Sequence, residues 1–517
     1  MNKKVFLSGI ICFGVLILVL MLTLGKDRQP TVTTVTIAVL RDSQVQDFDT
    51  NYYTGWLKQQ TGYNIKFEYI TPGSEREYLH EMLLTDEGRI DAVFLPERDI
   101  LTREELTAYA DAGLIEELGH FAAEDSSLKQ YLNDCTDKSL NLLENDDGIY
   151  YMPRADESRK KQNLQILWIN INWLKQLSLK VPETTEELRE VLIAFRDKDP
   201  NGNGVADELP MIYNISDNCR NSCWVLLNAF AYTNPESGFL YADGSDIVHD
   251  TCITEEFRNG LKYCHSLYDE GLLCGDCAGY NERQLKELVS GMSETVGAFT
   301  GRSIADIIYP NSSDVLAKYI QVPPLEGPQG ERNAVRIMNM AEPGGYIPAN
   351  AKHKREAFEI MDIMLSAEGS CIAAYGEENT DWRRAKTGEL SDYGTRATIT
   401  TINYLADKVQ NKNFHNAGPM YLSDEYANGT TWKGNDSFLE YFDTRAVRVY
   451  ENYYRDDIFA YSEEVGKAVA AVDKKATERA IEEFINGRRN IASDEAWESF
   501  VKERRGIYAE KEEDADR

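Results

Sequence analysis

The sequence has few of the residues that enzymes use for catalysis. Its 517 residues include six histidines, and the motifs H-E-x-x-H, G-x-S-x-G and G-x-x-x-x-G-K-[ST] are all absent. Acidic residues are numerous enough to supply a carboxylate pair for glycoside hydrolysis. However, the expected order of elements lacks the eight-fold strand–helix repeat of a barrel. The sequence therefore gives little support for an enzyme.

Positive charge is also scarce. Lysine and arginine number 55 against 86 aspartate and glutamate residues, which gives a formal net charge of −31. This excess argues against nucleic acid or an anionic lipid surface as the partner. Low-complexity blocks are absent, and the 42% hydrophobic content is ample for cores. A chain of this length predicts two or more domains.

One long apolar run stands at the N-terminus. Lys3 and Lys4 precede the run 5–24, which is long enough to span a bilayer. The basic flank would keep the N-terminus inside and the body outside. The run is longer than the core of a signal peptide, and 23–25 is a poor cleavage site. We expect residues 1–30 to be an uncleaved anchor on the extracellular face of the cell membrane; the alternative is a cleaved signal peptide and a secreted body.

Strand and helix patterns alternate between residues 35 and 112. Strands are expected at 35–40, 64–70 and 90–95, and helices at 53–61, 75–86 and 101–112. This order builds an open parallel sheet, so the fold class is α/β. Ligands of such sheets bind at the carboxyl ends of the strands. The residues at those ends include three charged candidates, Asp42, Arg98 and Asp99.

The densest group of oxygen-bearing side chains lies in the loop 199–208. Gly202 and Gly204 separate these side chains and allow sharp turns, because glycine reaches positive φ without steric cost. A hard cation needs six to eight oxygens around it. We predict a structural Ca²⁺ whose ligands are Asp199, Asn201, Asn203, the Val205 carbonyl, Asp207 and Glu208.

Two alternatives to this loop reading remain. Counting from Asp197 gives an EF-hand-like register, with Gly202 in the sixth place and Glu208 in the twelfth. The other alternative is an Asx- and Gly-rich surface turn that holds no metal. We prefer the shorter register that begins at Asp199, and neither register places a cation beside a reacting group.

The segment before the loop carries a resemblance to a known family. Residues 168–177 are typical of a strand that runs into a short helix, and 182–188 of a helix start with a threonine cap and acidic first turn. Together with the loop, residues 168–210 resemble the extracellular solute-binding proteins of ABC importers, which include sugar and oligosaccharide binders. In that family a Pro-x-Thr helix start leads to a D-P-N-G-N-G-x-x-D-E loop that holds Ca²⁺.

The resemblance implies a two-lobed periplasmic-binding-protein fold of type II. Each lobe would be a mixed or parallel sheet flanked by helices, with the ligand cleft between the lobes. We assign 31–166 and 344–386 to the N-terminal lobe, and 167–343 and 387–517 to the C-terminal lobe. The expected partners are ABC permease subunits in the membrane, and we expect a monomer.

The resemblance also suggests ligand-binding residues. Residues 89–99 and 105–118 are similar to the region of maltose-type binding proteins where the loop after the strand contacts sugar, which supports Arg98 and Asp99. The alternative for these two is a helix-capping loop with surface charges. Residues 148–155, with Arg154, resemble the segment before the first crossing between lobes. Residues 290–302 resemble a strand and loop that face the cleft, which adds Arg302.

Sugar binding requires aromatic faces that stack on pyranose rings and planar groups that pair with hydroxyls. The chain has 29 tyrosines and 7 tryptophans. Three tryptophans sit beside polar, turn-forming residues, which suits either the cleft or ordinary surface packing. They are Trp224, Trp382 and Trp432, and Arg383 follows the second of them.

Eight cysteines lie outside the apolar run, and six of them fall between residues 219 and 277. This clustering favours local disulfides in an exported protein. The pair Cys274 and Cys277 could instead be half of a zinc site, but a second C-x₂-C is missing. The connectivity stays open.

These observations favour the substrate-binding component of an ABC importer. It would bind a carbohydrate by closing two lobes around it, and the carbohydrate we expect is an oligosaccharide. The alternatives are a membrane-anchored sensor or peptide-binding protein of the same fold and, third, an extracellular hydrolase.

Overall fold

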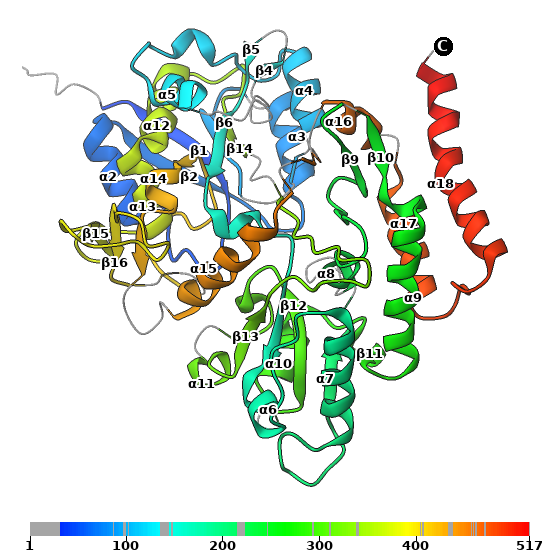
Figure 1. The fold of residues 1–517 in the computed structure, drawn as a ribbon. Helices are drawn as coiled ribbons and strands as arrows, with labels where there is room; N and C mark the ends of the chain where they lie inside the picture. Colours follow the sequence, from blue (N-terminus) through cyan, green and yellow to red (C-terminus); the bar gives the residue numbers. More distant parts are fainter. Residues whose placement is uncertain are drawn as a thin grey trace, which may run out of the picture.

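The computed structural model describes residues 32–515 with gaps at 86, 97–99, 102, 135–143, 146–147, 215–222, 246, 292–293, 310–311, 338–340, 404, 406–407, 433–437, 456, 459, 461–462 and 470–471. The described chain forms two lobes, one above the other in the view of Figure 1. Within the described residues, no helix has both the length and the apolar character to cross a membrane. The apolar run 5–24 lies outside them.

Lobe 1, the upper lobe in Figure 1, is built on a six-stranded sheet of order β17-β6-β14-β3-β1-β2. All its strands are parallel except β14, which pairs antiparallel with β3 and β6. This confirms the expected α/β fold class. The strands are β1 (Thr34–Leu40), β2 (Asn64–Ile70), β3 (Ala92–Phe94), β6 (Met152–Asp156), β14 (Glu342–Tyr346) and β17 (Met420–Leu422).

The helices of lobe 1 cover this sheet and bury its apolar side chains. The Asn51 side chain accepts a hydrogen bond from Tyr53 N at the start of α2, and Gly62 ends that helix with a φ of 73°. The helices are α2 (Tyr52–Thr61), α3 (Glu75–Thr85), α4 (Arg103–Asp111), α5 (Ser127–Asp134), α12 (Lys354–Leu365), α13 (Ala367–Tyr375) and α14 (Asp424–Ala427). The first three match the expected helices to within two residues.

Lobe 2 is built on a five-stranded sheet of order β11-β8-β12-β7-β13. Its strands are β7 (Ile166–Asn170), β8 (Leu209–Ile212), β11 (Leu273–Cys274), β12 (Val296–Gly301) and β13 (Tyr319–Val322). The strand-to-helix pattern expected at 168–177 is present as β7 followed by α6. The helices are α6 (Ile171–Gln176), α7 (Thr185–Asp197), α8 (Cys223–Leu227), α9 (Glu255–Asp269), α10 (Glu282–Val289), α11 (Ser313–Leu316), α17 (Lys474–Ile485) and α18 (Asp494–Ala515).

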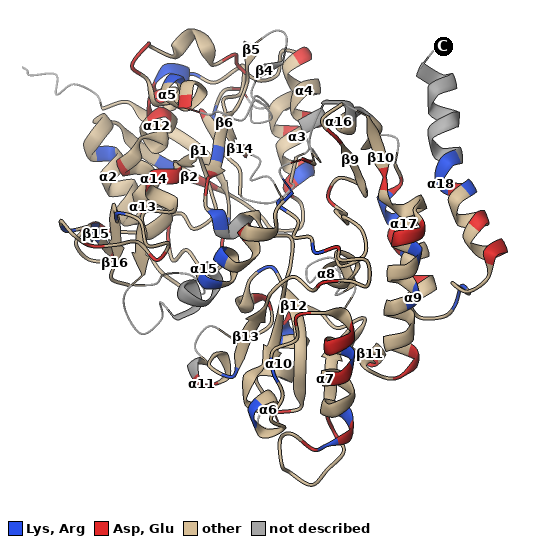
Figure 2. Cartoon of the chain, in the orientation of Figure 1, with Lys and Arg blue, Asp and Glu red and all other residues tan. Residues whose placement is uncertain are grey.

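Smaller elements complete the lobes. A hairpin of β9 (Leu240–Ala242) and β10 (Val248–Asp250) packs with α16 (Glu463–Val469) through Leu240, Ala242 and Val465. A three-stranded sheet joins β15 (Trp382–Arg384), β16 (Ile399–Thr401) and β18 (Thr430–Trp432) beside lobe 1. A short hairpin joins β4 (Glu144–Asn145) and β5 (Gly148–Ile149). Figure 2 shows acidic and basic residues interspersed on the helices of both lobes.

The chain crosses between the lobes in three neighbouring segments. The first leads from β6 through a short 3₁₀ turn (Arg159–Gln162) into β7, the second leads from β13 to β14, and the third follows α15 (Phe438–Tyr450). Backbone hydrogen bonds join them: Ile337 N donates to the Gln162 carbonyl at 2.7 Å, and Ala334 N donates to the Tyr453 carbonyl at 3.0 Å. The Tyr454 hydroxyl also donates to Asn163 Oδ1 at 2.7 Å.

One predicted lobe boundary differs from the sheet topology. Residues 387–517 were expected in the C-terminal lobe, but β17 pairs with β6 in the sheet of lobe 1. The chain therefore returns to lobe 2 only at α15, which Figure 1 shows between the two lobes and whose Ala446 and Tyr450 pack in the core of lobe 2. A three-residue strand is too short to carry a recognisable pattern of its own.

Candidate ligand site and calcium loop

The two sheets present the carboxyl ends of their parallel strands to the crossing segments. In lobe 1, β6 runs directly into the first crossing, and β1, β2 and β3 run in the same direction. In lobe 2, Gly301 at the end of β12 lies opposite Ile166 at the start of β7. In both sheets, the edge at which α/β sheets usually bind ligands is therefore next to the hinge.

Asp42 lies at this edge of lobe 1, as the sequence analysis expected. Its Oδ2 is 2.7 Å from His415 Nδ1, and its Oδ1 accepts a hydrogen bond from Gln44 N at 2.7 Å. About a quarter of each side chain of the Asp42–His415 pair is exposed, at 25% and 26%. A carboxylate oriented by a histidine and still reachable from solvent suits hydrogen bonding to a ligand hydroxyl.

Arg154 comes from strand β6 of the same sheet, which β14 and β3 separate from β1, and its guanidinium bonds the backbone of the segment that contains His415. Its Nη1 donates to the Gly418 carbonyl at 2.9 Å, and its Nη2 donates to the His415 carbonyl at 3.2 Å. The residue is only 6% exposed. Arg154 thus holds the backbone that carries His415 beside Asp42. The sequence did not link these three residues, because 261 positions separate Arg154 from His415.

Two of the candidate tryptophans are core residues. Trp224 is 3% exposed and packs edge-to-face against Phe239, with ring centroids 5.3 Å apart. Trp382 is 1% exposed and donates its Nε1–H to the Gly376 carbonyl at 2.8 Å. The polar residues next to each tryptophan indicate a local turn, but whether the ring is buried depends on tertiary packing.

The other candidates differ in exposure. Trp432 is half-buried and packs edge-on against Tyr375, with centroids 5.9 Å apart. Arg383 forms two hydrogen bonds with the Glu389 carboxylate, at 2.9 and 2.7 Å, so its guanidinium is already paired. Arg302 is exposed and directly follows β12 at the hinge edge of lobe 2. Arg98 and Asp99 lie outside the described residues.

The helix before the calcium loop forms as its sequence predicts. The Thr184 side chain accepts a hydrogen bond from Glu187 N at 3.1 Å and begins α7, which ends at Asp197. The Asp197 carboxylate pairs with Arg196 at 2.7 and 3.1 Å. The helix therefore ends two residues before Asp199, where the shorter of the two predicted registers begins.

The loop itself folds around the side chain of Asp199. Asn203 N donates to Asp199 Oδ1 at 3.1 Å, and Gly204 N donates to Asp199 Oδ2 at 3.0 Å. Gly202 and Gly204 have φ values of 71° and 77°, the positive range that glycine adopts easily. Asn203 Nδ2 also donates to Asp207 Oδ1 at 3.1 Å.

The end of the loop gathers negative charge. Burial raises the pKa of Glu208, and the neighbouring carboxylates of Asp199 and Asp207 raise it further. Glu208 Oε1 is shielded from solvent and accepts no hydrogen bond. An unpartnered oxygen beside two other carboxylates fits a hard cation. Within the described residues, however, no group of three or more His, Cys, Asp or Glu side chains is arranged so that it could hold a metal.

Replacing Glu208 with glutamine is expected to raise the melting temperature of the metal-free protein at pH 7. The ionised carboxylate is disfavoured in the folded state, so its removal relieves a penalty that exists above the ordinary glutamate pKa of 4.5. The gain should disappear as the pH falls toward that value. Thermal melts in chelator between pH 4 and pH 8, with the exposed Glu190→Gln as control, would measure it; equal melting temperatures at pH 7 would contradict the repulsion.

The described cysteines fall into one disulfide and four buried thiols. Cys274 and Cys277 form a disulfide with a Cα–Cα distance of 5.6 Å, in line with the preference for local disulfides over zinc at this pair. The thiols belong to Cys223, Cys252, Cys264 and Cys371. Burial raises the pKa of the Cys371 thiol to about 12, so it stays protonated. Cys135 and Cys219 lie outside the described residues.

The chain is similar to two curated carbohydrate-binding proteins, while no family model matches it. It is 25% identical over 393 residues to the fructooligosaccharide ABC transporter substrate-binding protein FusA of Streptococcus pneumoniae, a match that covers 73% of this chain and 70% of FusA. It is 24% identical over 331 residues to the polygalacturonan/rhamnogalacturonan-binding protein YtcQ of Bacillus subtilis, covering 61% of this chain and 62% of YtcQ.

Solved structures show the same fold. FusA in complex with kestose superposes with a TM-score of 0.71 at 19% identity, covering 93% of this chain and 97% of FusA. An extracellular solute-binding protein from Bifidobacterium longum subsp. infantis superposes with a TM-score of 0.71 at 20% identity, covering 92% and 95%. Another FusA structure is of an EF-hand mutant, with a TM-score of 0.70 at 21% identity over 93% of this chain and 97% of FusA. These matches confirm the predicted two-lobed α/β fold of the periplasmic-binding-protein type.

Proposed function

We propose that this protein is the substrate-binding component of an ABC importer and that it binds an oligosaccharide between its two lobes. The observation that carries this proposal is the match to FusA in sequence and in structure, over most of both chains. The fold adds a physical reason, because both sheets direct their ligand-binding edges at a hinge of three crossing segments.

Binding would close the lobes around the saccharide, as hinge motion does in other two-lobed binding proteins. Asp42 with His415 on lobe 1 and Arg302 on lobe 2 lie at the two facing edges. Carboxylate and guanidinium groups bond neighbouring sugar hydroxyls in planar pairs. Arg98, Asp99 and Trp432 stay candidates for the same site. Arg154 would position the backbone of the site and would not contact the ligand, because its Nη atoms donate to backbone carbonyls.

The protein would act at the cell surface as a monomer and deliver the saccharide to permease subunits in the membrane. The apolar run 5–24 would hold it there, with the body outside. A Ca²⁺ ion would stabilise the loop 199–208 far from any reacting group. Its proposed ligands are Asp199, Asn201, Asn203, the Val205 carbonyl, Asp207 and Glu208; their chemistry and the unpartnered Glu208 oxygen support this assignment.

A thermal-shift and calorimetric screen of residues 31–517 would test the function. The probes are kestose, nystose, maltotriose, trigalacturonate and short peptides, with Ca²⁺ present. We expect a saturable upward shift with a saccharide and no product on chromatography; a ligand at 100 times its Kd stabilises by about 2.7 kcal/mol. A shift with peptides alone would favour the sensor or peptide-binding alternative, and release of shortened sugars would favour a hydrolase.

A further inference from the structure

The β9–β10 hairpin of lobe 2 carries an aromatic cluster that the sequence analysis did not single out. Tyr241 and His249 lie directly opposite each other on the two strands, and their rings stack with centroids 5.0 Å apart and planes 22° apart. Tyr232 packs edge-on against Tyr241, with centroids 5.7 Å apart. All three side chains are half-buried, so part of the aromatic surface faces solvent.

The imidazole in this stack is held in a defined orientation. His249 Nε2 is 2.7 Å from Asp243 Oδ2. Asp243 is fixed in turn by Ser245, whose hydroxyl donates at 2.6 Å and whose backbone N–H donates at 2.9 Å. These hydrogen bonds, with that from His249, lower the pKa of Asp243. The stack is therefore a prearranged surface, which limits the entropy lost when a ligand packs on it.

Hydrogen bonds link planar polar groups of the hinge to the stack. Asn333 bonds Arg455 and donates its Nδ2 to the Asn228 carbonyl at 3.0 Å, and Asn228 Oδ1 accepts from Thr233 N, the residue after Tyr232, at 2.9 Å. Arg455 directly follows Tyr454 in the third crossing; its guanidinium makes two 2.7 Å hydrogen bonds to Asp457 and one of 3.2 Å to Asn333 Oδ1. Glu331 is 3.7 Å from Arg455 Nη1. Burial raises the pKa of Tyr241; Arg455 lowers it, and Asp243, Asp457 and Glu331 raise it further.

We propose that the Tyr241–His249 stack and the Arg455 network form a subsite for one ring of a neutral saccharide. The proposal rests on the proposed function and specifies the class of ligand. An aromatic face suits the C–H face of a sugar ring, and guanidinium and carboxylate groups bond its hydroxyls. The subsite contains three carboxylates and one guanidinium. The carboxylates belong to Asp243, Asp457 and Glu331, and the guanidinium belongs to Arg455. A uronic acid ring would be repelled.

The position of the subsite couples it to closure. Glu331 precedes the second crossing, where Ala334 bridges to Tyr454 of the third, and Arg455 continues that third crossing. Asn333 joins both to lobe 2, because its Nδ2 donates to the Asn228 carbonyl at 3.0 Å. A ring seated on the hairpin would therefore contact lobe 2 and the hinge together. Figure 1 shows the hairpin extending upward from lobe 2 to the level of α3 and α4 of lobe 1.

Calorimetry of the intact soluble body with kestose, maltotriose and trigalacturonate tests the subsite. We expect Tyr241→Ala to weaken binding of the neutral saccharide by about ten-fold or more, the scale of a buried aromatic contact, and Tyr241→Phe by less than about three-fold. Tyr63→Ala is the matched control, because Tyr63 is a half-buried tyrosine of lobe 1 bonded to Glu359. It should bind as the wild type does.

A second variant keeps the charge argument testable if Tyr241→Ala folds poorly. The double change Glu331→Gln with Asp457→Asn removes two negative charges and should raise the affinity for trigalacturonate at least about three-fold. If Tyr241→Ala binds kestose or maltotriose as tightly as Tyr63→Ala does, the subsite is overturned but the proposed function is not. If the wild-type protein prefers trigalacturonate, the subsite is not specific for neutral saccharides. Absence of binding to every saccharide would overturn the proposed function and the subsite with it.

Discussion

Chelation of calcium is expected to lower the melting temperature of the wild-type protein by about 5–10 °C. A metal that binds only the native state at 100 times its Kd stabilises it by about 2.7 kcal/mol, and 1 kcal/mol shifts the melting temperature of a lobe of roughly 200 residues by about 2–4 °C. The physical source is the charge at the end of the loop, where burial and the carboxylates of Asp199 and Asp207 raise the pKa of Glu208. A cation would replace that repulsion with attraction.

The loop variants identify the ligands. Asp199→Ala with Asp207→Ala should remove the calcium response, so that melting curves with and without chelator coincide. Asp197→Ala is the matched control, because the Asp197 carboxylate already pairs with Arg196. It should keep the full response under the Asp199 register, and loss of the response in this variant would establish the EF-hand-like register instead. A wild-type protein that melts identically in calcium and in chelator would contradict a structural metal.

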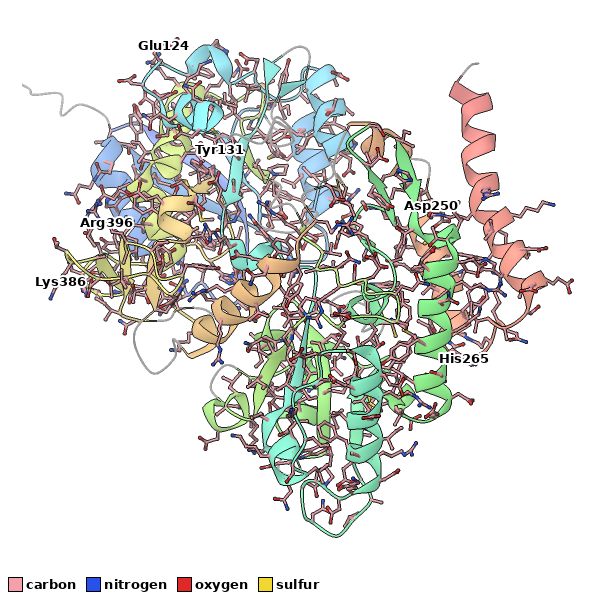
Figure 3. All side chains as sticks on the ribbon, in the orientation of Figure 1. Glu124, Tyr131, Asp250, His265, Lys386 and Arg396 are labelled. Atoms are coloured by element: carbon pink, nitrogen blue, oxygen red, sulfur yellow. A yellow bond between two sulfur atoms is a disulfide. The ribbon has the colours of Figure 1, made fainter. Side chains whose placement is uncertain are left out.

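Replacing Arg504 with alanine is expected to destabilise lobe 2 by about 3–5 kcal/mol, the usual cost of leaving a buried charge unpaired. The Arg504 side chain is 1% exposed and its partner Asp250 is 8% exposed. Its Nε donates to Asp250 Oδ2 at 2.7 Å, its Nη1 to Thr477 Oγ1 at 2.8 Å and its Nη2 to the Gly238 carbonyl at 2.6 Å. Arg504 thus ties α18 to α17 and to the hairpin that ends at Asp250, which Figure 3 labels on the α18 side of lobe 2.

Urea unfolding measures this effect, and Arg505→Ala is the natural control because Arg505 is the next residue and is exposed. It should change the free energy of unfolding by less than about 0.5 kcal/mol. Arg504→Met with Asp250→Leu should recover much of the loss, because an apolar pair leaves no buried charge. A single variant as stable as wild type would show that Asp250 finds other partners, since it already accepts a hydrogen bond from Cys252 N.

Local sequence rules predicted much of the chain. The threonine cap, acidic first turn and apolar stripe predicted α7, and the cap is present at Thr184. The β-branched and alternating runs predicted the first strands of lobe 1 and their parallel order. Each of these signals depends on neighbours within a few positions, and such interactions hold in any tertiary context. The fold class followed from the order of those elements.

The site residues were harder to predict because they depend on contacts between distant segments. Asp42 was correctly expected at a strand end, but its partner His415 lies 373 positions away. Trp224 and Trp382 were candidates for the cleft, yet both rings are buried in cores. The stacking of Tyr241 on His249 could not be predicted, because the sequence shows only a tyrosine and a histidine on either side of a turn.

The sequence by itself determined the α/β class, the helix and loop that the proposed calcium site uses, and the resemblance that pointed to a solute-binding protein. Each of these is encoded in short-range patterns of polarity, capping and turn residues. The tertiary structure alone decided the pairing of β17 with β6, the convergence of Asp42, Arg154 and His415, and the aromatic hairpin beside the hinge. Those features arise when burial of both cores brings remote segments together, and no local pattern specifies which segments will meet.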